Sequence, residues 1–393
     1  MSAGYDLVIA GGGIHGVGIA QAAAAAGHSV LLLEKTALAS GSSSRSSKLI
    51  HGGLRYLESG QLRLVRESLH ERTTLLRIAP ELVRLQRFHI PVYRRTRRRS
   101  WQLRVGLSLY TALGGFARGT GFGTVPRSQW PQLDGLATDG LQTVFWYHDA
   151  QTDDAQLTRA VMHSAQQLGA ELAQPARFVS ATLSGDRVIV HYRDGETERE
   201  CSAEVLVNAG GPWAEQLARS ISPAISIPPL QMVQGTHIVL PGHPERGFYY
   251  VESPRDGRAI FVMPWHGQTL IGTTELPFHG DPDAVAPSAR EVAYLLGVAR
   301  HYFPKYRTAD ASTILASFAG LRVLPAGPGH AFHRSRETLL LTDRTHRPRV
   351  LSVYGGKLTT WRAVSERALQ RLAGSLPQRM ARARTDQLRL QAS

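Results

Sequence analysis

The sequence predicts an α/β fold in which a nucleotide-binding domain with a parallel sheet carries a second domain built on an antiparallel sheet. Residues 6–33 have the pattern strand, glycine turn, alanine-rich helix and strand, which is a βαβ unit. Four short apolar segments separated by turn residues follow between residues 238 and 271, as in an antiparallel sheet. A helical pattern returns at residues 358–372. The nucleotide-binding domain is therefore expected to be discontinuous, with the antiparallel block inserted into it.

Length and composition limit the class of protein. The chain has 393 residues, of which 42% are hydrophobic, enough for a large core and two interleaved domains. Its one cysteine, Cys201, excludes a disulfide framework and a cysteine-rich metal site, so no metal is expected. The sequence shows no signal peptide and no run of about 20 apolar residues. These features predict a cytoplasmic location.

The net charge of +14 calls for an anionic partner, which could be a polyanion, a membrane surface or a substrate. The basic segment Tyr93–Arg99 precedes the mostly apolar segment Val105–Ala117, and Trp101 lies between them. Two interpretations stay open for this region. It could be an anchor that lies in a membrane interface, or a core helix preceded by a solvated arginine loop.

The remaining elements follow from periodicity and from turn residues. An amphipathic helix is expected from Tyr56 to Ala79, where Pro80 ends it, and the arginine-rich tail Gln378–Ser393 is expected to be mobile. The predicted nucleotide-binding domain covers residues 1–80, 145–215 and 335–393, and the second domain covers 81–144 and 216–334. The predicted strands after the βαβ unit are Val188–Tyr192, Val205–Val207, Ile238–Leu240, Tyr249–Val251, Ala259–Met263, Thr269–Ile271, Leu339–Leu341 and Val350–Val353.

A glycine motif at the first turn predicts a Rossmann-like dinucleotide site. Gly11, Gly13 and Gly16 have the spacing GxGxxG, with a strand before them and a helix after them. The first glycine permits a tight turn, the second lets the backbone approach a pyrophosphate, and the third lets helix and strand pack closely. Glu34 ends the second strand, where a carboxylate accepts hydrogen bonds from both ribose hydroxyls. A 2′-phosphate would be excluded there, which argues against NADP.

A hydroxyl-rich loop, Gly41–Ser47, comes soon after the second strand. Its serines could donate hydrogen bonds to the phosphates and to the ribityl chain of a dinucleotide, or the loop could be a flexible linker. The segments around it carry a resemblance that favours the first interpretation.

Several motifs together resemble the FAD-dependent glycerol-3-phosphate dehydrogenase family. The most specific is the block from Ser46 to Glu58, which reads SSKLIHGGLRYLE. The others keep the order and spacing of that family over residues 5–370. They are Asp153-Asp154, Val207–Trp213, Gly235–Val239, Pro264-Trp265, Ile271–Thr274, Gly320–Arg322 and Gly355–Arg362.

The resemblance implies a D-amino-acid oxidase type of fold, with FAD as cofactor and a capping domain over the substrate. It implies oxidation of sn-glycerol 3-phosphate to dihydroxyacetone phosphate by hydride transfer to flavin N5, with electrons passed to a quinone. Peripheral association with the cytoplasmic face of the inner membrane is a further expectation, and no nucleic acid is expected as a partner. Members of that family generally continue into a C-terminal helical domain, and this sequence ends about where that domain would begin.

The resemblance also assigns catalytic and substrate-binding roles. Arg322 and Arg55 are expected to clamp the phosphate, because the planar fork of arginine suits a doubly charged phosphate. Lys357, at the start of the last helix, is expected at the pyrimidine edge of the flavin. His237 is the first candidate for the general base, with His51 as the second choice. Tyr56 is expected to orient the substrate.

The residues expected to contact the cofactor combine these motifs. They are Gly11, Gly13, Ile14, His15, Gly16, Glu34, Lys35, Ser42, Ser43, Ser44, Ser46, Ser47, Lys48, Leu49, His51, Gly52, Ala209, Gly210, Trp213, Gly355, Gly356, Lys357, Leu358, Thr359 and Thr360.

Two other functions remain open. A related flavoprotein could oxidise a 2-hydroxy acid or an amino acid, since a carboxylate also fits an arginine clamp. A flavin-binding protein without turnover could instead bind a membrane or nucleic acid, supported by the net charge of +14 and the run from Tyr93 to Arg99.

Overall fold

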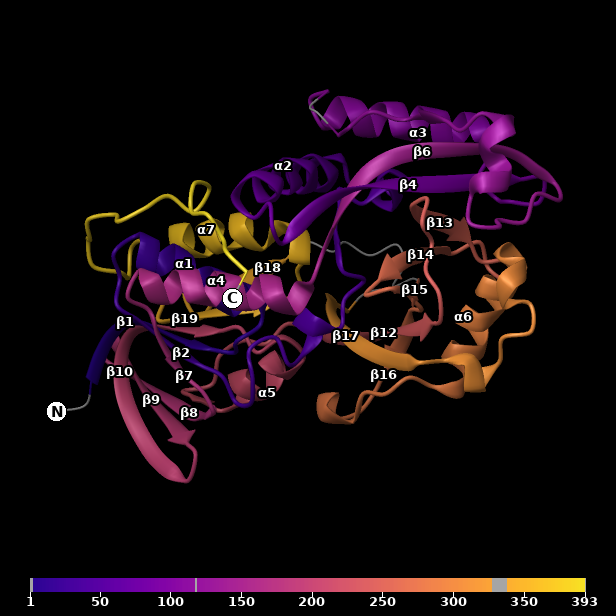
Figure 1. Cartoon of the computed structure of the whole chain (residues 1–393). Coiled ribbons are helices and arrows are strands. Elements are labelled where there is room, and N and C mark those ends of the chain that lie inside the picture. The colour runs from indigo at the N-terminus through magenta and orange to yellow at the C-terminus, as the bar shows by residue number, and fades with distance from the viewer. Residues whose placement is uncertain (1–2, 117–118, 327–337, 393) are drawn as a thin grey trace.

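Two large sheets lie side by side in the computed structural model, which describes residues 3–116, 119–326 and 338–392 (Figure 1). The first sheet, on the left of Figure 1, contains the N-terminal strand and the last strands of the chain. The second sheet, on the right, is built from the middle of the chain together with one strand near residue 50. The nucleotide-binding part is therefore discontinuous in sequence.

The first sheet has a parallel centre in which β1 pairs with β2 on one side and with β10 on the other. The end of β10 also pairs in parallel with β19, while its first half forms an antiparallel hairpin with β9. The strands of this sheet are β1 (Ala3–Ala10), β2 (Val30–Leu33), β7 (Glu171–Ala173), β8 (Ala176–Ser184), β9 (Arg187–Asp194), β10 (Thr197–Asn208), β11 (Ile221–Ser222), β18 (Leu339–Thr342) and β19 (Val350–Tyr354).

Helices cover both faces of this sheet. Helix α1 contacts α4 and α7 over one face, and the short α5 packs against β8, β10 and β19 (Figure 1). Small residues allow α1 to pack closely: a Cβ on Gly18 would lie 2.6 Å from Ser365 Oγ of α7. The helical segments are α1 (Ile14–Ala25), α4 (Asp154–Gln167), η4 (Gly211–Trp213), α5 (Ala214–Arg219), η9 (Leu358–Thr360) and α7 (Trp361–Leu372).

The second sheet has the strand order β16-β12-β15-β14-β13-β4-β6-β3, with β17 paired to β12 and β5 paired to β6. The predicted domain boundary at residue 145 falls inside β6, which pairs with β4 through to Thr152. The strands are β3 (Leu49–Ile50), β4 (Val83–Tyr93), β5 (Gly123–Thr124), β6 (Leu141–Thr152), β12 (Leu230–Leu240), β13 (Phe248–Glu252), β14 (Ala259–Trp265), β15 (Gln268–Gly272), β16 (Leu276–Phe278) and β17 (Ala316–Pro325).

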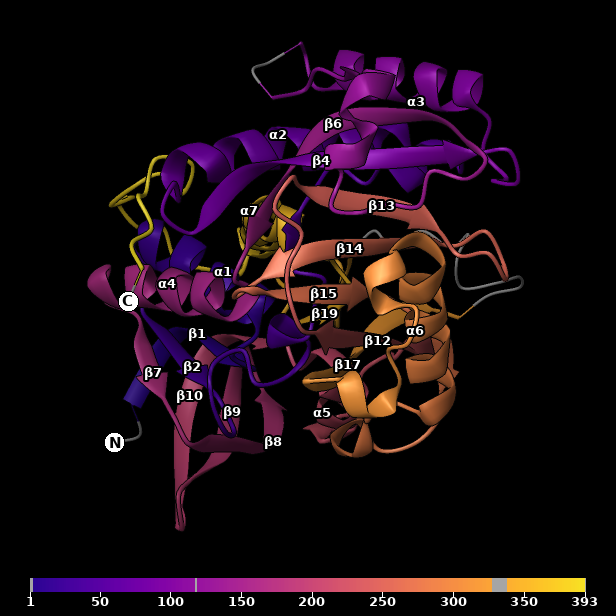
Figure 2. The same cartoon turned by 45° about the vertical axis from the view of Figure 1, so that its right-hand side comes forward.

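Helix α6 covers one side of the second sheet, as Figure 2 shows, and α3 lies over β4 and β6. The amino end of α6 has a capping box in which Ser288 Oγ and the Glu291 carboxylate bond each other's backbone N–H. The helical segments of this half are η1 (Ser42–Ser44), η2 (Leu54–Leu57), α2 (Leu62–Ile78), α3 (Ser100–Leu113), η3 (Arg127–Gln132), η5 (Pro282–Ala284), α6 (Ala289–Tyr302), η6 (Pro304–Tyr306) and η7 (Ala311–Thr313).

The amphipathic helix expected from Tyr56 to Ala79 is divided in the structure. A 3₁₀ turn, η2, comes first, and α2 begins only at Leu62. Gly60 has a φ of +71°, a left-handed conformation that a continuous right-handed helix cannot contain. The break separates Arg55 and Tyr56 from α2.

The C-terminal tail is ordered, so the expected mobility of Gln378–Ser393 is wrong for the described residues through 392. The tail contains no helix or strand, but Leu390 is 1% exposed and belongs to the core of the first sheet. Arg379 forms an ion pair with Asp6 at 3.0 Å. Apolar burial and ion pairs thus hold a segment whose composition suggested a solvated chain.

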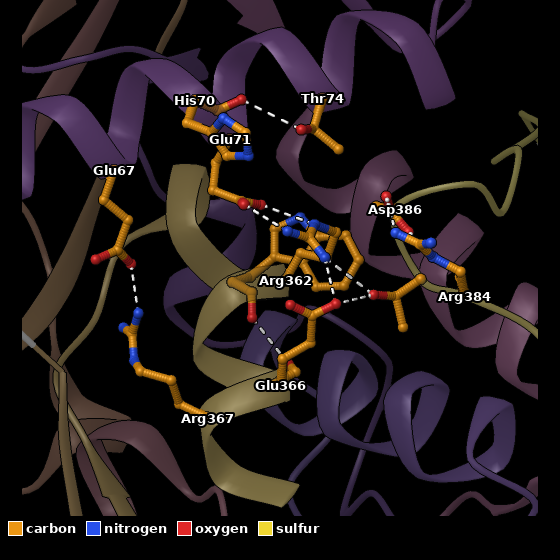
Figure 3. Close-up of polar contacts among 12 residues, drawn as sticks. Glu67, His70, Glu71, Thr74, Arg362, Glu366, Arg367, Arg384 and Asp386 are labelled. Atoms are coloured by element: carbon orange, nitrogen blue, oxygen red, sulfur yellow. Dashed lines mark hydrogen bonds and ion pairs between the residues drawn. The ribbon is translucent and has the colours of Figure 1, made fainter. Parts of the chain in front are cut away.

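A polar network joins this tail to α2 and α7, as Figure 3 shows. Arg362 of α7 forms an ion pair with Glu71 of α2 at 2.6 Å, and both side chains are at most 6% exposed. Thr385 of the tail accepts a hydrogen bond from Arg362 at 3.0 Å and donates one to Glu366 at 2.6 Å. The network fixes the start of α7, directly after the Gly355–Thr360 motif.

Candidate active site

A cavity of about 770 Å³ is lined by residues of both sheets. The glycine turn, the end of β2 and the hydroxyl-rich loop line one part of it. Residues of η2, β14, β17 and the loop before α7 line another part. Its size is within the range of pockets that bind cofactors and small molecules.

The glycine turn has the geometry that a pyrophosphate requires. Gly11 has a φ of +116°, and a Cβ there would lie 2.5 Å from Ala209 O. A Cβ on Gly16 would lie 1.9 Å from Gly11 O, so a side chain at either position would displace the backbone. Gly13 caps the amino end of α1 and lines the cavity. The cradle fits a dinucleotide phosphate at a helix N-terminus.

Glu34 follows β2 and lines the cavity. Its carboxylate accepts hydrogen bonds from Gly12 N and Thr36 N, each at 2.8 Å, which fix its position beside the glycine turn. Lys35 Nζ lies 3.0 Å from Asp283 of η5 and 3.9 Å from the centre of the Trp213 ring. This contact connects the dinucleotide end of the cavity to the second half of the molecule.

The hydroxyl-rich loop is a structured part of the site, because its serines bond several elements. Ser43 Oγ accepts a hydrogen bond from Ile14 N at 2.9 Å, and Ser42 Oγ donates one to Leu321 O at 2.6 Å. Lys48 is 5% exposed and lies outside the cavity lining, and its ammonium is 2.6 Å from Asp154 Oδ1. In the structure Lys48 therefore braces the loop from beneath, and its contact with the cofactor stays a prediction.

The loop before α7 returns to the glycine turn. A Cβ on Gly356 would lie 2.0 Å from His15 Nε2, so a glycine is required there. The ammonium of Lys357 lies 3.7 Å from the centre of the Tyr56 ring and 3.4 Å from Ser68 Oγ of α2. Thr359 Oγ1 accepts a hydrogen bond from His51 N at 3.1 Å. Lys357, Tyr56 and His51 thus share one region of the cavity.

Three arginines converge on one buried carboxylate in the cavity wall. Glu275, whose side chain is 2% exposed, lies 2.8 Å from Arg258, 3.7 Å from Arg55 and 3.8 Å from Arg322. A Cβ on Gly235 would lie 3.0 Å from Arg322 Nη2, so this glycine makes room for the guanidinium. The wall is strongly cationic and suits a multiply charged anion.

Sequence reasoning did not find Arg258 and gave no role to Glu275. Arg258 directly precedes β14, and Glu275 directly precedes β16. Neither residue belongs to one of the motifs that carry the family resemblance. Arg258 directly precedes the predicted strand Ala259–Met263, and this position is the one signal that the sequence carries for it.

The two candidate bases have different environments. His237 is 1% exposed, lies outside the cavity lining, and its ring stacks on Phe318 at 4.9 Å. Burial, followed by the charges of Arg322 and Lys48, holds the pKa of His237 well below its usual value. His237 therefore lies behind the cavity wall, next to Ser47, and its role as the base stays a prediction. His51, the second choice, lines the cavity.

Most of the expected site residues lie on the cavity wall. Six do not line it: Gly16, Ser44, Lys48, Gly52, Thr360 and His237. Those that line it are Gly11, Gly13, Ile14, His15, Glu34, Lys35, Ser42, Ser43, Ser46, Ser47, Leu49, His51, Arg55, Tyr56, Ala209, Gly210, Trp213, Arg322, Gly355, Gly356, Lys357, Leu358 and Thr359.

Comparisons with known proteins agree with this geometry. Residues 6–362 match the FAD dependent oxidoreductase family. The chain is 40% identical over 380 residues to a glycerol-3-phosphate dehydrogenase of Pseudomonas aeruginosa, covering 94% of this chain and 71% of that protein. It is 37% identical over 378 residues to a D-erythritol 1-phosphate dehydrogenase of Brucella abortus, covering 95% and 74%.

A solved structure has the same fold. The glycerol-3-phosphate dehydrogenase of Bacillus halodurans, complexed with FAD, superposes with a TM-score of 0.76 at 27% identity, covering 98% of this chain and 67% of that one. The comparisons confirm the predicted fold and the predicted cofactor, FAD. This chain belongs to the FAD-dependent oxidoreductase family, together with the glycerol-3-phosphate dehydrogenases that it resembles.

Proposed function

We propose that this protein oxidises sn-glycerol 3-phosphate to dihydroxyacetone phosphate. The observation that carries the proposal is the group of three guanidiniums, from Arg55, Arg258 and Arg322, in the wall of a cavity that also contains the dinucleotide cradle. A phosphate monoester carries about two negative charges near neutral pH, and arginine binds it through paired hydrogen bonds. The named relatives act on phosphorylated polyols, which supports the same substrate class.

Different residues of this chain would bind the phosphate, orient the carbon chain and accept the hydroxyl proton. The arginines would hold the phosphate, and Tyr56, against which Lys357 packs, would orient the carbon chain. His51 is the candidate base for the hydroxyl proton, because it lines the cavity and its backbone is held by Thr359. FAD, when bound, supplies the acceptor for the hydride from C2.

The remaining expected cofactor contacts belong to this proposal. The glycine turn with Ile14 would hold the pyrophosphate, and Glu34 would accept hydrogen bonds from the ribose. Ser42, Ser46 and Ser47 line the cavity beyond the turn, where a ribityl chain would lie.

Anaerobic reduction of the holoenzyme tests the substrate. The visible flavin absorbance should bleach on addition of sn-glycerol 3-phosphate, and the comparison panel should contain D-erythritol 1-phosphate, a 2-hydroxy acid and an amino acid. Preferential bleaching by the carboxylate compounds would establish the rival oxidase function. A flavin that none of these compounds reduces, in a protein that binds nucleic acid with a steep salt dependence, would establish the non-catalytic alternative.

A quinone in a membrane is proposed as the electron acceptor, because α3 presents an apolar stripe to solvent. None of the described helices is long and apolar enough to cross a bilayer. Trp101 and Val105 are 67% and 61% exposed on the outer face of α3, while Leu103 and Leu107 pack inward. The helix lies at the outer edge of the molecule in Figure 1. Five exposed arginines lie in α3 or in the segment just before it: Arg94, Arg95, Arg97, Arg99 and Arg104.

Vesicle binding tests this surface, which we place on the cytoplasmic face of the inner membrane. The Trp101→Ser/Val105→Ser variant should lose most of its co-sedimentation with anionic phospholipid vesicles. Leu315→Ser, which changes a 54% exposed leucine after η7, is the matched control and should bind as the wild type does. Equal binding by all three proteins would exclude α3 as the docking surface. Reoxidation of the reduced holoenzyme by quinone or by oxygen then identifies the acceptor.

A further inference from the structure

Glu275 is an acidic residue in the cationic wall of the cavity. It ends the loop between β15 and β16, and its side chain is 2% exposed. One oxygen, Oε2, faces Arg258 at 2.8 Å and Arg55 at 3.7 Å, and the other, Oε1, faces Arg322 at 3.8 Å. A carboxylate facing three guanidiniums at a proposed phosphate site reduces the positive charge there, and therefore needs an explanation.

The three arginines come from separate parts of the chain. Arg55 lies in η2, Arg258 directly before β14, and Arg322 in the middle of β17. Guanidiniums this close to one carboxylate repel one another, and a shared anion is what allows them to occupy one wall before any substrate arrives.

The loop that carries Glu275 is itself firmly held. Thr274 Oγ1 donates a hydrogen bond to the buried Glu291 of α6 at 2.6 Å and accepts one from Thr236 N at 2.8 Å. Thr273 Oγ1 accepts a hydrogen bond from Arg322 Nη2 at 3.4 Å. Because its neighbour Thr274 is anchored to the core, Glu275 is a fixed point to which the three arginine side chains can be aligned.

We propose that Glu275 is a positioning residue, which aligns the three guanidiniums in a wall where these four side chains together carry a net charge of +2. This inference rests on the proposed function and deepens it. A phosphate dianion neutralises such a wall, whereas a singly charged carboxylate leaves one positive charge uncompensated in a partly buried site. Arrangement of the guanidiniums before binding also reduces the ordering cost of binding the substrate.

Substitution of Glu275 in the holoenzyme tests the role. In Glu275→Gln the amide keeps one acceptor oxygen but turns an N–H₂ group toward a guanidinium, so the alignment is lost. KM for sn-glycerol 3-phosphate should rise about tenfold or more while kcat stays within about threefold, because the phosphate lies away from the reacting C2. Glu275→Asp keeps the charge and should bring KM back to within about threefold of the wild-type value.

Glu252 provides a matched control. Its side chain is 10% exposed, against 2% for Glu275, and accepts a hydrogen bond from Arg98 Nη1 at 2.7 Å, but it lies outside the cavity lining. Glu252→Gln should lower thermal stability and leave KM unchanged. If Glu275→Gln behaves like Glu252→Gln, or lowers kcat and leaves KM unchanged, Glu275 is a structural ion-pair partner and the proposal is wrong.

Binding of inorganic phosphate, measured by calorimetry on the oxidised holoenzyme, separates this proposal from the proposed reaction. Weaker binding to Glu275→Gln than to the wild type supports the role of Glu275 even if glycerol 3-phosphate fails to reduce the flavin, in which case only the substrate is wrong. Equal binding to both proteins overturns the role of Glu275 even if glycerol 3-phosphate is oxidised.

Discussion

His51 and His237 show how burial decides whether an imidazole can act on a substrate. His237 packs against Phe318, and a Cβ on Gly272 would lie 2.1 Å from its ring. Its Nε2 lies 3.0 Å from Ser47 Oγ, so its polar contact is with the hydroxyl-rich loop, Gly41–Ser47. His51 borders the cavity instead and packs edge-on to Phe261 with 6.3 Å between ring centres. Of the two imidazoles, His51 is therefore the one that lines the cavity, whereas His237 meets the cavity wall through Ser47.

Substitution of the two histidines should separate these roles. His51→Asn should slow flavin reduction by about 10² to 10⁴-fold, the usual contribution of a general base. His237→Asn should keep the rate of reduction within about tenfold of the wild type, with the loss appearing in thermal stability. Stopped-flow measurement of flavin reduction at several pH values is the test. A larger loss of rate in His237→Asn than in His51→Asn would reverse the assignment.

Single residues were predictable where they belong to local motifs. Gly11, Gly16 and Glu34 were found from spacing, because tight turns and close backbone contacts impose strict local sequence requirements. Arg258 and Glu275 were not, because their importance arises from contacts with Arg55 and Arg322, far away in sequence. In a chain with 45 lysines and arginines, an arginine outside a motif carries little information.

Among the elements, α2 and α7 determine the position of Lys357, the lysine expected at the flavin. Helix α2 contributes Ser68 beside Lys357, Glu71 beside Arg362, and Glu67 beside Arg367. These contacts repeat along one face of α2, since residues three or four apart share a face. Sequence periodicity predicted both helices, but not the start of α2 at Leu62 or the ion pairs between them.

The buried Glu71–Arg362 pair should contribute much more to stability than the neighbouring Glu67–Arg367 pair. Burial is the largest effect on the Glu71 carboxyl and raises its pKa, although Arg362 acts in the opposite direction. Glu71→Ala leaves the Arg362 guanidinium buried without its main partner and should lower the free energy of unfolding by about 3–5 kcal/mol. Glu67→Ala breaks a more exposed pair and should cost less than about 1 kcal/mol. Urea denaturation followed by circular dichroism measures both, and similar losses would contradict the argument.

At the scale of the whole molecule, buried histidines should make the protein less stable in acid. Burial lowers the pKa of His15 and of His89 to about 4, and holds that of His237 well below its usual value. These groups stay neutral in the folded state, whereas the unfolded chain binds protons below about pH 6.5, so the free energy of unfolding falls as pH decreases below that value. Each histidine contributes up to about 1.4 kcal/mol per pH unit.

Thermal unfolding of the holoprotein between about pH 8 and pH 5 measures this effect. Tm should decrease below about pH 6.5, and His89→Phe should make the decrease smaller, because His89 lies in β4 outside the cavity and its Nδ1 has no hydrogen-bond partner. An identical pH dependence in the wild type and in His89→Phe would show that other groups cause the acid sensitivity.

The architecture was largely predictable, because α/β sheets and inserted antiparallel sheets have different hydrophobic periods. The strands predicted in the middle of the chain occur as β12 to β15, extended by up to several residues at their ends. The packing of the C-terminal tail against the core was not predictable, because Arg379 and Leu390 contact surfaces that distant parts of the chain form. Composition alone describes such a segment poorly.

The contact between Gly356 and His15 has a consequence for biosynthesis. These residues are neighbours in the cradle of the flavin but lie far apart in the sequence, so a ribosome must reach Gly356 before they can meet. Domains generally fold as units, and the strand that completes this one, β19, is made late. Cofactor capture should therefore wait until β19 and the loop that follows it have been made, and the supply of free flavin at that stage should limit how much newly made protein becomes active.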